Sequence, residues 1–125
     1  MPDASVLIVD DDPVVRRMLQ LSFESEGFNV LTASDGIEGL ETIRSDRPDV
    51  VVLDIMMPKL DGMKVMRELN SDADLRGTPV ILLSAKATSL DIELGLKAGA
   101  ADYVTKPCDP IDLVDRVRSL LTKTP

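Results

Sequence analysis

The sequence predicts an α/β fold, in which helices cover both faces of a parallel β-sheet to form a three-layer sandwich. Two observations support this prediction. Five short runs of β-branched and other apolar residues alternate along the chain with segments that have helical spacing. The run at residues 50–53 is apolar throughout, as is typical of a central strand that is buried on both faces. Strands that are joined through helices by short links are expected to be parallel, with right-handed crossovers.

The strands are expected where these five runs occur. In open parallel sheets, ligands bind beyond the carboxyl ends of the strands. The side chains that follow each run are therefore the first candidates for a functional site. The runs occupy residues 6–9, 28–32, 50–53, 80–83 and 101–104.

Capping residues, prolines and glycines mark the expected helix boundaries. The first helix can begin with Asp11 or Asp12 as its cap and with Pro13 in its first turn. Gly27 should end it, because glycine readily adopts the left-handed conformation that follows many helices. The other helices are expected after Ser34 and before Pro48, after Gly62, from about Ser89 to Ala98 with Gly99 as the stop, and from about Asp109 and Pro110 onward.

Apolar residues at helical spacing predict which face of each helix packs on the sheet. In the third helix these are Met63, Met66 and Leu69. In the others, the expected inward positions are Val15, Met18, Leu19 and Ser22 in the first helix, Ile37, Leu40 and Ile43 in the second, and Ile111, Val114, Val117 and Leu121 in the fifth.

Composition and charge exclude several classes of function. The 125 residues suit one domain, and 14 basic against 22 acidic side chains give a net charge of −8. Such an acidic surface disfavours binding to nucleic acid or to anionic membranes. No apolar run approaches the ~20 residues of a membrane helix and no signal peptide is recognisable, so a cytoplasmic protein is expected. The absence of histidine, with Cys108 as the one cysteine, excludes histidine-based catalysis and Cys/His zinc sites.

Carboxylates follow two of the expected strands. Asp10 and Asp11 come directly after the first run, and Asp54 comes after the third. If these strands are neighbours, the three charges lie close together and oppose folding until a cation neutralises them. Mg²⁺ suits such a site, because it binds one or two carboxylates together with carbonyls and waters. Ser84 and Lys106, which follow the fourth and fifth runs, can hold an anion beside the metal.

Four stretches, in this order, carry a resemblance to a known family: LIVDDDP, VVLDIMMPKLDG, PVILLSAK and GAADYVTKP. The chain resembles the receiver domains of two-component response regulators, the CheY-like family. This resemblance implies a doubly wound, flavodoxin-like sheet of five parallel strands in the order 2-1-3-4-5, flanked by five helices. It covers nearly the whole chain. Residues 1–125 are therefore expected to form a single receiver domain, either complete or part of a longer regulator.

The resemblance also implies roles for residues at the strand ends. Asp54 is expected to be the phosphoacceptor, which takes a phosphoryl group from a phosphohistidine of a partner kinase. Asp10, Asp11 and Asp54, with the backbone carbonyl of Met56, are expected to hold Mg²⁺. Lys106 is expected to pair with the Asp54 carboxylate before transfer and with phosphate oxygens after it.

Two more residues are expected to transmit the change. Ser84 matches the hydroxyl residue that moves to bond the phosphoryl group, and Tyr103 matches the aromatic residue that then turns inward. The Lys106–Pro107 peptide bond is cis in the family that the chain resembles. Asp12, next to the acidic pair, is interpreted as a helix cap and not as a metal ligand.

The expected function is that of a phosphorylation-dependent switch in a two-component system. The chain is expected to act on no external substrate, and to catalyse only its own phosphoryl transfer and autodephosphorylation. Phosphorylation should change the face of the fourth helix, fifth strand and fifth helix, which then controls an effector protein or an appended output domain. The expected partner on the input side is a sensor histidine kinase or a phosphotransfer protein. The domain should be a monomer or a phosphorylation-dependent dimer, without direct contact to nucleic acid or membrane.

Three other functions fit parts of the pattern. A haloacid dehalogenase-like phosphatase also uses an Asp nucleophile with Mg²⁺, but it needs a second Asp two residues later, where this chain has Met56. A nucleotide or flavin binder would carry a glycine-rich phosphate loop or more aromatic residues. A receiver-like module that works without phosphorylation would be favoured by the loss of any of Asp10, Asp11, Asp54 or Lys106, and all four are present.

Overall fold

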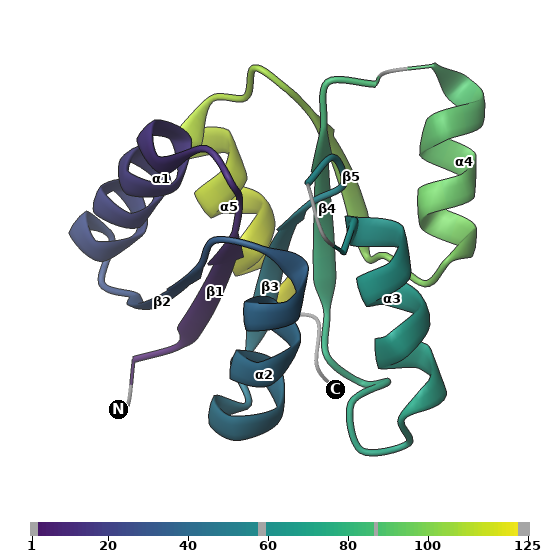
Figure 1. Ribbon diagram of the computed structural model, residues 1–125. Coiled ribbons are helices and arrows are strands. Elements are labelled where there is room, and N and C mark those ends of the chain that lie inside the picture. The colour runs from purple at the N-terminus through teal and green to yellow at the C-terminus, as the bar shows by residue number, and fades with distance from the viewer. Residues whose placement is uncertain (1–2, 58–59, 87, 123–125) are drawn as a thin grey trace.

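The sheet has five parallel strands in the order β2-β1-β3-β4-β5, with helices on both faces (Figure 1). This computed structural model describes residues 3–57, 60–86 and 88–122. The predicted fold class, including the strand order, is confirmed. The strands are β1 (Ser5–Val9), β2 (Asn29–Ala33), β3 (Val50–Asp54), β4 (Val80–Ser84) and β5 (Asp102–Thr105).

Each helix begins at a side chain that accepts a hydrogen bond from an N–H of the first turn. Such caps satisfy N–H groups that have no partner within the helix. The helices and their caps are α1 (Pro13–Ser25) with Asp12, α2 (Gly36–Asp46) with Asp35, α3 (Gly62–Ser71) with Asp61, α4 (Ser89–Lys97) with Thr88, and α5 (Pro110–Leu121) with Asp109.

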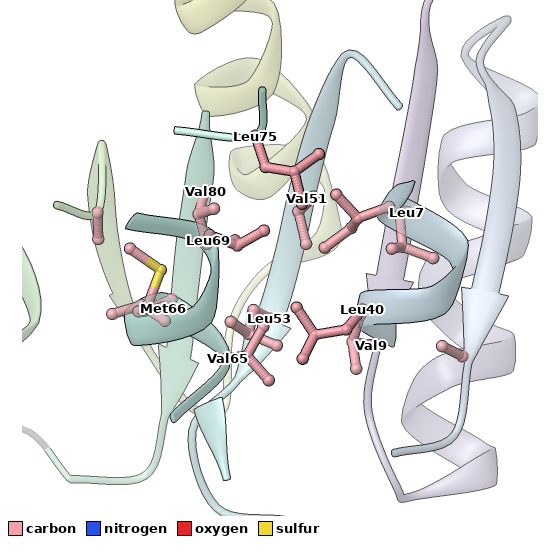
Figure 2. Close-up of a cluster of buried hydrophobic side chains, with 14 of the residues drawn as sticks. Leu7, Val9, Leu40, Val51, Leu53, Val65, Met66, Leu69, Leu75 and Val80 are labelled. Atoms are coloured by element: carbon pink, nitrogen blue, oxygen red, sulfur yellow. The ribbon is translucent and has the colours of Figure 1, made fainter. Parts of the chain in front are cut away.

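Successive residues of the central strands face opposite layers of the molecule. In β1, Val6 and Ile8 belong to the core under α1 and α5, whereas Leu7 and Val9 belong to the core under α2 and α3. Figure 2 shows the second core, in which side chains from α2 and α3 point toward β3. All residues of β3 and β4 are buried, which explains why the run at 50–53 lacks alternation. Fully burying one such side chain contributes roughly 1.5–3 kcal/mol.

Several strands extend further toward their carboxyl ends than predicted. Pairing continues to Asp54 in β3, which lies opposite Leu83, and to Ser84 in β4, which lies opposite Thr105. As a result, two of the predicted site residues are the last residues of buried strands. Their backbones are held by the sheet, and their side chains start from fixed positions.

Three predicted inward positions are wrong. Met18 is 42% exposed, Ile37 is 49% exposed and Ile111 is 72% exposed. In α1 the buried residues are instead Leu19 and Phe23, and the Phe23 ring packs edge-on against Phe28. The other predicted inward residues are buried or partly buried, among them Leu40, Ile43, Met66, Leu69, Val114 and Val117.

Candidate functional site at the carboxyl edge of the sheet

Neighbouring strands bring the predicted site residues together at one edge of the sheet. β3 pairs with β1 on one side and with β4 on the other, and β4 pairs with β5. Asp10 directly follows β1, Asp54 ends β3, Ser84 ends β4, and Lys106 directly follows β5. The backbone continues this pairing, because the N–H of Lys106 donates to the carbonyl of Ser84 at 2.8 Å.

Three carboxylates form a cluster of oxygen atoms at this edge. One oxygen from each of Asp10, Asp11 and Asp54 lies within 4.8 Å of the other two. Asp10 is fully buried and Asp54 is 3% exposed, whereas Asp11 is exposed. The predicted convergence of these three side chains is thus present in the structure.

Backbone N–H groups orient the two buried carboxylates. Oδ1 of Asp10 accepts a hydrogen bond from the N–H of Asp12 at 2.9 Å. Oδ1 of Asp54 accepts one from the N–H of Met56 at 3.2 Å. The guanidinium of Arg16 in α1 donates to the backbone carbonyl of Asp10 at 2.8 Å, which ties this loop to α1.

Lys106 reaches both buried carboxylates. Its Nζ lies 2.9 Å from Oδ2 of Asp10 and 3.2 Å from Oδ2 of Asp54. Burial lowers the pKa of Lys106, but its hydrogen bond to Asp10 and the two carboxylate charges outweigh burial, so the pKa lies above its usual value. The peptide bond between Lys106 and Pro107 is cis, as the sequence resemblance implied.

Asp54 is held in a position where its negative charge is unfavourable. Burial, together with the charge of Asp10, raises its pKa to about 6, although Lys106 and the N–H of Met56 both favour the ionised form. One lysine charge therefore only partly compensates two buried carboxylates. Binding of a further cation beside such a carboxylate would stabilise its ionised form.

Gly62 allows α3 to begin directly against the end of β3. A Cβ at this position would lie 2.6 Å from the carbonyl oxygen of Asp54 and 2.8 Å from the Cα of Ile55. The N–H of Gly62 donates to the carbonyl of Ile55 at 2.9 Å. Any side chain at residue 62 would push this turn away and displace Asp54.

Ser84 and Tyr103 meet at the backbone of Lys86. Oγ of Ser84, which is fully buried, accepts a hydrogen bond from the N–H of Lys86 at 3.0 Å. The Tyr103 hydroxyl donates to the carbonyl of the same residue at 2.8 Å, and its ring is 8% exposed. The two residues predicted to form the switch are thus joined through one peptide segment.

The donor atoms of the cluster fit a hard divalent cation. They are carboxylate oxygens on rigid strand ends, and no histidine or second cysteine exists to favour a softer metal. For Met56, the structure describes a hydrogen bond of its N–H to Asp54, and the role of its carbonyl as a ligand stays a prediction. Asp12 accepts bonds from the N–H groups of Val14 and Val15, which confirms that it caps α1.

Sequence reasoning missed two contributors to this edge. Arg16 bonds the Asp10 carbonyl, and Gly62 lets α3 approach β3. The sequence pattern marks Gly62 only as a helix boundary. A glycine so close to Asp54 in the sequence was a signal of close backbone approach, whereas nothing in the sequence distinguishes Arg16 from its neighbour Arg17.

Comparison with protein families decides the identity of the domain. The family model described as the response regulator receiver domain matches residues 6–118. The chain belongs to this family. The predicted family and the predicted place in two-component signalling are confirmed, and the chain is a receiver domain of the response regulator type.

Curated relatives of this receiver domain include regulatory proteins of Streptomyces and Mycolicibacterium species. The transcriptional regulatory protein CseB of Streptomyces coelicolor is 49% identical over 118 residues, which are 94% of this chain and 49% of that protein. The DNA-binding response regulator MtrA of Mycolicibacterium smegmatis is 43% identical over 94% of this chain and 50% of its own length. This chain therefore spans about half the length of these relatives.

Solved structures agree with the family and the fold. The receiver domain of the Francisella response regulator 1452 superposes with a TM-score of 0.93, at 37% identity, over 98% of this chain and 100% of that one. A putative response regulator from Chloroflexus aurantiacus gives a TM-score of 0.91 at 33% identity, with 98% and 100% of the two chains covered. Among the described residues, none of the helices is both long and apolar enough to cross a membrane.

Proposed function

We propose that Asp54 of this receiver domain accepts a phosphoryl group from a phosphohistidine of a sensor histidine kinase or phosphotransfer protein. One observation carries this proposal. Asp54 ends a buried strand with the oxygens of Asp10 and Asp11 within 4.8 Å and with Lys106 Nζ at 3.2 Å. A nucleophilic carboxylate, a cation site and a fixed positive charge thus share one edge of the sheet.

In the proposed transfer, a carboxylate oxygen of Asp54 attacks phosphorus. The bond between phosphorus and the partner's imidazole nitrogen breaks, and its electron pair leaves with that nitrogen. The imidazole is released as a neutral group when its other nitrogen carries a proton. The product is an acyl phosphate on Asp54, which water later hydrolyses in the domain's own autodephosphorylation. We expect no other substrate.

The chain's own residues prepare this step. The N–H of Met56 orients the Asp54 carboxylate, and Lys106 lies where it can pair with phosphoryl oxygens once they arrive. Asp10, Asp11, Asp54 and the Met56 carbonyl would hold Mg²⁺. When bound, this ion supplies positive charge that neutralises the phosphoryl oxygens during transfer. The phosphoryl group carries close to two negative charges, in place of the single charge of the Asp54 carboxylate.

The proposed output begins at Ser84. A phosphoryl group on Asp54 attracts the Ser84 hydroxyl, and the change reaches Tyr103 through Lys86, whose backbone bonds both side chains. The face of α4, β5 and α5 then presents a different surface to an effector or to an output domain of the same chain. As the CseB and MtrA relatives are named as transcriptional and DNA-binding regulators, control of transcription is the output we favour for the whole protein.

Phosphorylation with a small phosphodonor tests the proposal. The protein is incubated with acetyl phosphate and Mg²⁺ or with acetyl phosphate and EDTA, and its intact mass is measured. We expect the mass of one added phosphoryl group with Mg²⁺, and none with EDTA or in an Asp54→Asn variant. Asp12→Asn is the matched control, because it removes a neighbouring charge but keeps the helix cap, and it should be labelled like the wild type.

Two results would overturn this assignment. Label on the Asp54→Asn variant would move the site to another residue. An unlabelled wild-type protein that still binds Mg²⁺ would instead favour a receiver-like module that works without phosphorylation.

A further inference from the structure

Helix α4 packs on the rest of the fold through a glycine. The structure describes all of its residues, and Gly95 is the one that is buried. Its large apolar side chains lie mostly outside, with Leu90 63% exposed, Leu94 51% and Leu96 45%. A helix normally packs through a stripe of large apolar residues, and here the centre of the packed face is a residue without a side chain.

The ring of Tyr103 lies against this glycine. A Cβ built on Gly95 would come within 2.8 Å of Cδ2 and 3.0 Å of Cε2 of the Tyr103 ring, and within 3.1 Å of Cδ1 of Leu82. Real Cβ contacts are essentially never shorter than 3.0 Å, so the 2.8 Å contact means that any larger residue would compete with the ring for the same space. Leu82 belongs to the buried strand β4 and has little freedom to move.

Tyr103 links α4 to the phosphorylation site. Its hydroxyl donates to the carbonyl of Lys86, and the N–H of Lys86 donates to Oγ of Ser84. Gly95 is thus connected to Ser84, at the end of β4, through the Tyr103 ring and the two hydrogen bonds of Lys86. The carboxyl end of α4, just beyond Gly95, is also held by α3, because Nδ2 of Asn70 donates to the carbonyl of the C-cap residue Ala98.

The geometry points to Gly95 as a positioning residue for Tyr103. We propose that the missing side chain at Gly95 creates the space that the inward Tyr103 ring occupies, and that this contact couples α4 to the state of Ser84. The inference rests on the proposed function, because it assumes that the signal passes through Ser84 and Tyr103. It adds the site on α4 where that signal is received.

A methyl group at residue 95 should therefore act on the ring and not on the helix. Alanine favours helix over glycine, so Gly95→Ala would strengthen α4 if packing were unaffected. The added Cβ instead displaces the ring from its inward position and breaks the bond from its hydroxyl to Lys86. Phosphorylation of Asp54 would continue, but Tyr103 would stay displaced from its buried position in both states.

The composition of the chain makes this directly measurable. Tyr103 is the only tyrosine and the protein has no tryptophan, so tyrosine fluorescence reports on this ring alone. The experiment measures acrylamide quenching of that fluorescence, with intact mass recorded on the same samples. Wild type, Gly95→Ala and Gly77→Ala are compared with Mg²⁺ alone and with Mg²⁺ and acetyl phosphate. Gly77 is the matched control, because a Cβ there would meet nothing within 4 Å.

We expect a several-fold higher quenching constant for Gly95→Ala than for the wild type and Gly77→Ala, before any phosphodonor is added. Acetyl phosphate transfers its phosphoryl group to Asp54 and releases acetate. Quenching should stay low in the wild type and in Gly77→Ala and stay high in Gly95→Ala, although all three gain the same mass. Equal quenching of Gly95→Ala and the wild type under both conditions would overturn the proposal.

A second variant addresses the case in which Gly95→Ala does not fold. Removing the ring in a Gly95→Ala/Tyr103→Leu double variant should restore folding, as measured by far-UV circular dichroism and thermal melting. If the double variant is as unfolded as Gly95→Ala, the clash does not involve the ring and the proposal is wrong.

Failure of the proposed function would appear differently. If no protein gains mass but Gly95→Ala still exposes Tyr103, the phosphoacceptor assignment fails and the positioning role of Gly95 stands. If all three proteins gain mass and the fluorescence of Gly95→Ala is quenched like that of the wild type, the phosphoacceptor assignment stands and the positioning role of Gly95 fails.

Discussion

Lys106 shares one positive charge between two buried carboxylates. Its Nζ contacts Oδ2 of both Asp10 and Asp54, and the exposed Asp11 adds a third negative charge nearby. Pairs of buried groups are stabilising only when charge and hydrogen bonds are both balanced. We therefore expect the side chains at this edge to accommodate additional positive charge and, after the proposed transfer, a phosphoryl group.

Met56 is expected to limit access of water to Asp54. Its side chain is 55% exposed, and it lines a hollow of ≈ 590 Å³ together with Met57, Met63 and Lys86. Its own N–H bonds the Asp54 carboxylate, so the backbone of Met56 lies directly beside the proposed acyl phosphate. A side chain of this kind excludes water without offering it a hydrogen bond.

Met56→Asn is expected to shorten the lifetime of phosphorylated Asp54. The Asn amide can hold a water molecule near phosphorus, and one such hydrogen bond of about 1 kcal/mol corresponds to a roughly fivefold faster hydrolysis. The decay of the phosphorylated mass after removal of acetyl phosphate measures this rate. Met56→Leu keeps an apolar side chain of similar size and should decay like the wild type. Equal rates in the Asn variant and the wild type would show that Met56 does not limit hydrolysis.

At the scale of elements, α1 begins within the site. Asp12 caps this helix through the N–H of Val14 at 2.9 Å and of Val15 at 3.4 Å, and its own N–H bonds Asp10. One aspartate thus fixes both the start of the helix and the orientation of a buried carboxylate. The side chain of Asp12 is engaged by the helix, whereas Asp10 and Asp11 contribute oxygens to the carboxylate cluster with Asp54.

Asp12→Ala should separate the capping role from metal binding. Loss of an N-cap side chain lowers the free energy of unfolding by about 1 kcal/mol, whereas Asn caps almost as well as Asp. We expect this loss for Asp12→Ala and only a few tenths of a kcal/mol for Asp12→Asn, as measured by urea unfolding. Mg²⁺ affinity should change little in both variants. A large loss of Mg²⁺ affinity in both would instead identify Asp12 as a ligand.

The strands and the site were predictable because they depend on local patterns and on one topological rule. Runs of β-branched residues located the strands, and polar residues at their ends located Asp10, Asp54 and Lys106. Parallel pairing then brings such ends together. The resemblance to a family supplied the strand order, which the residue pattern by itself left open.

Helix orientation was less predictable, because it depends on neighbouring elements. α5 carries apolar residues on more than one face, so the pattern permits more than one rotation about the helix axis. Packing beside α1 and on β5 selects the rotation that buries Leu113 and leaves Ile111 72% exposed. The contact of Gly95 with Tyr103 likewise arises only when α4 is placed against β5. A glycine inside a helical segment was the available signal for it.

For the whole molecule, the strained charge of Asp54 lowers stability in the absence of a divalent cation. The folded pKa of Asp54 is about 6 against an ordinary value of 3.8, so between these values the folded state binds more protons than the unfolded state. The free energy of unfolding therefore falls as pH rises from about 4 to about 6. Since one pKa unit corresponds to about 1.4 kcal/mol, this contribution reaches at most about 3 kcal/mol above pH 6.

Asp54→Asn should therefore stabilise the metal-free protein while it weakens the response to Mg²⁺. At pH 7.5 in EDTA, we expect the variant to unfold at a higher urea concentration than the wild type. Its free energy of unfolding should be higher by up to about 3 kcal/mol. At pH 4.5 the difference should shrink, because Asp54 is then mostly protonated in the folded wild type. Mg²⁺ at a hundredfold excess over its dissociation constant raises the free energy of unfolding by about 2.7 kcal/mol. This increase should be larger for the wild type than for the variant. Urea unfolding followed by far-UV circular dichroism, with NaCl at matched ionic strength as the control, measures all of these differences. A variant that is less stable than the wild type in EDTA at pH 7.5 would show that Lys106 already neutralises Asp54, and that the carboxylate cluster is not strained.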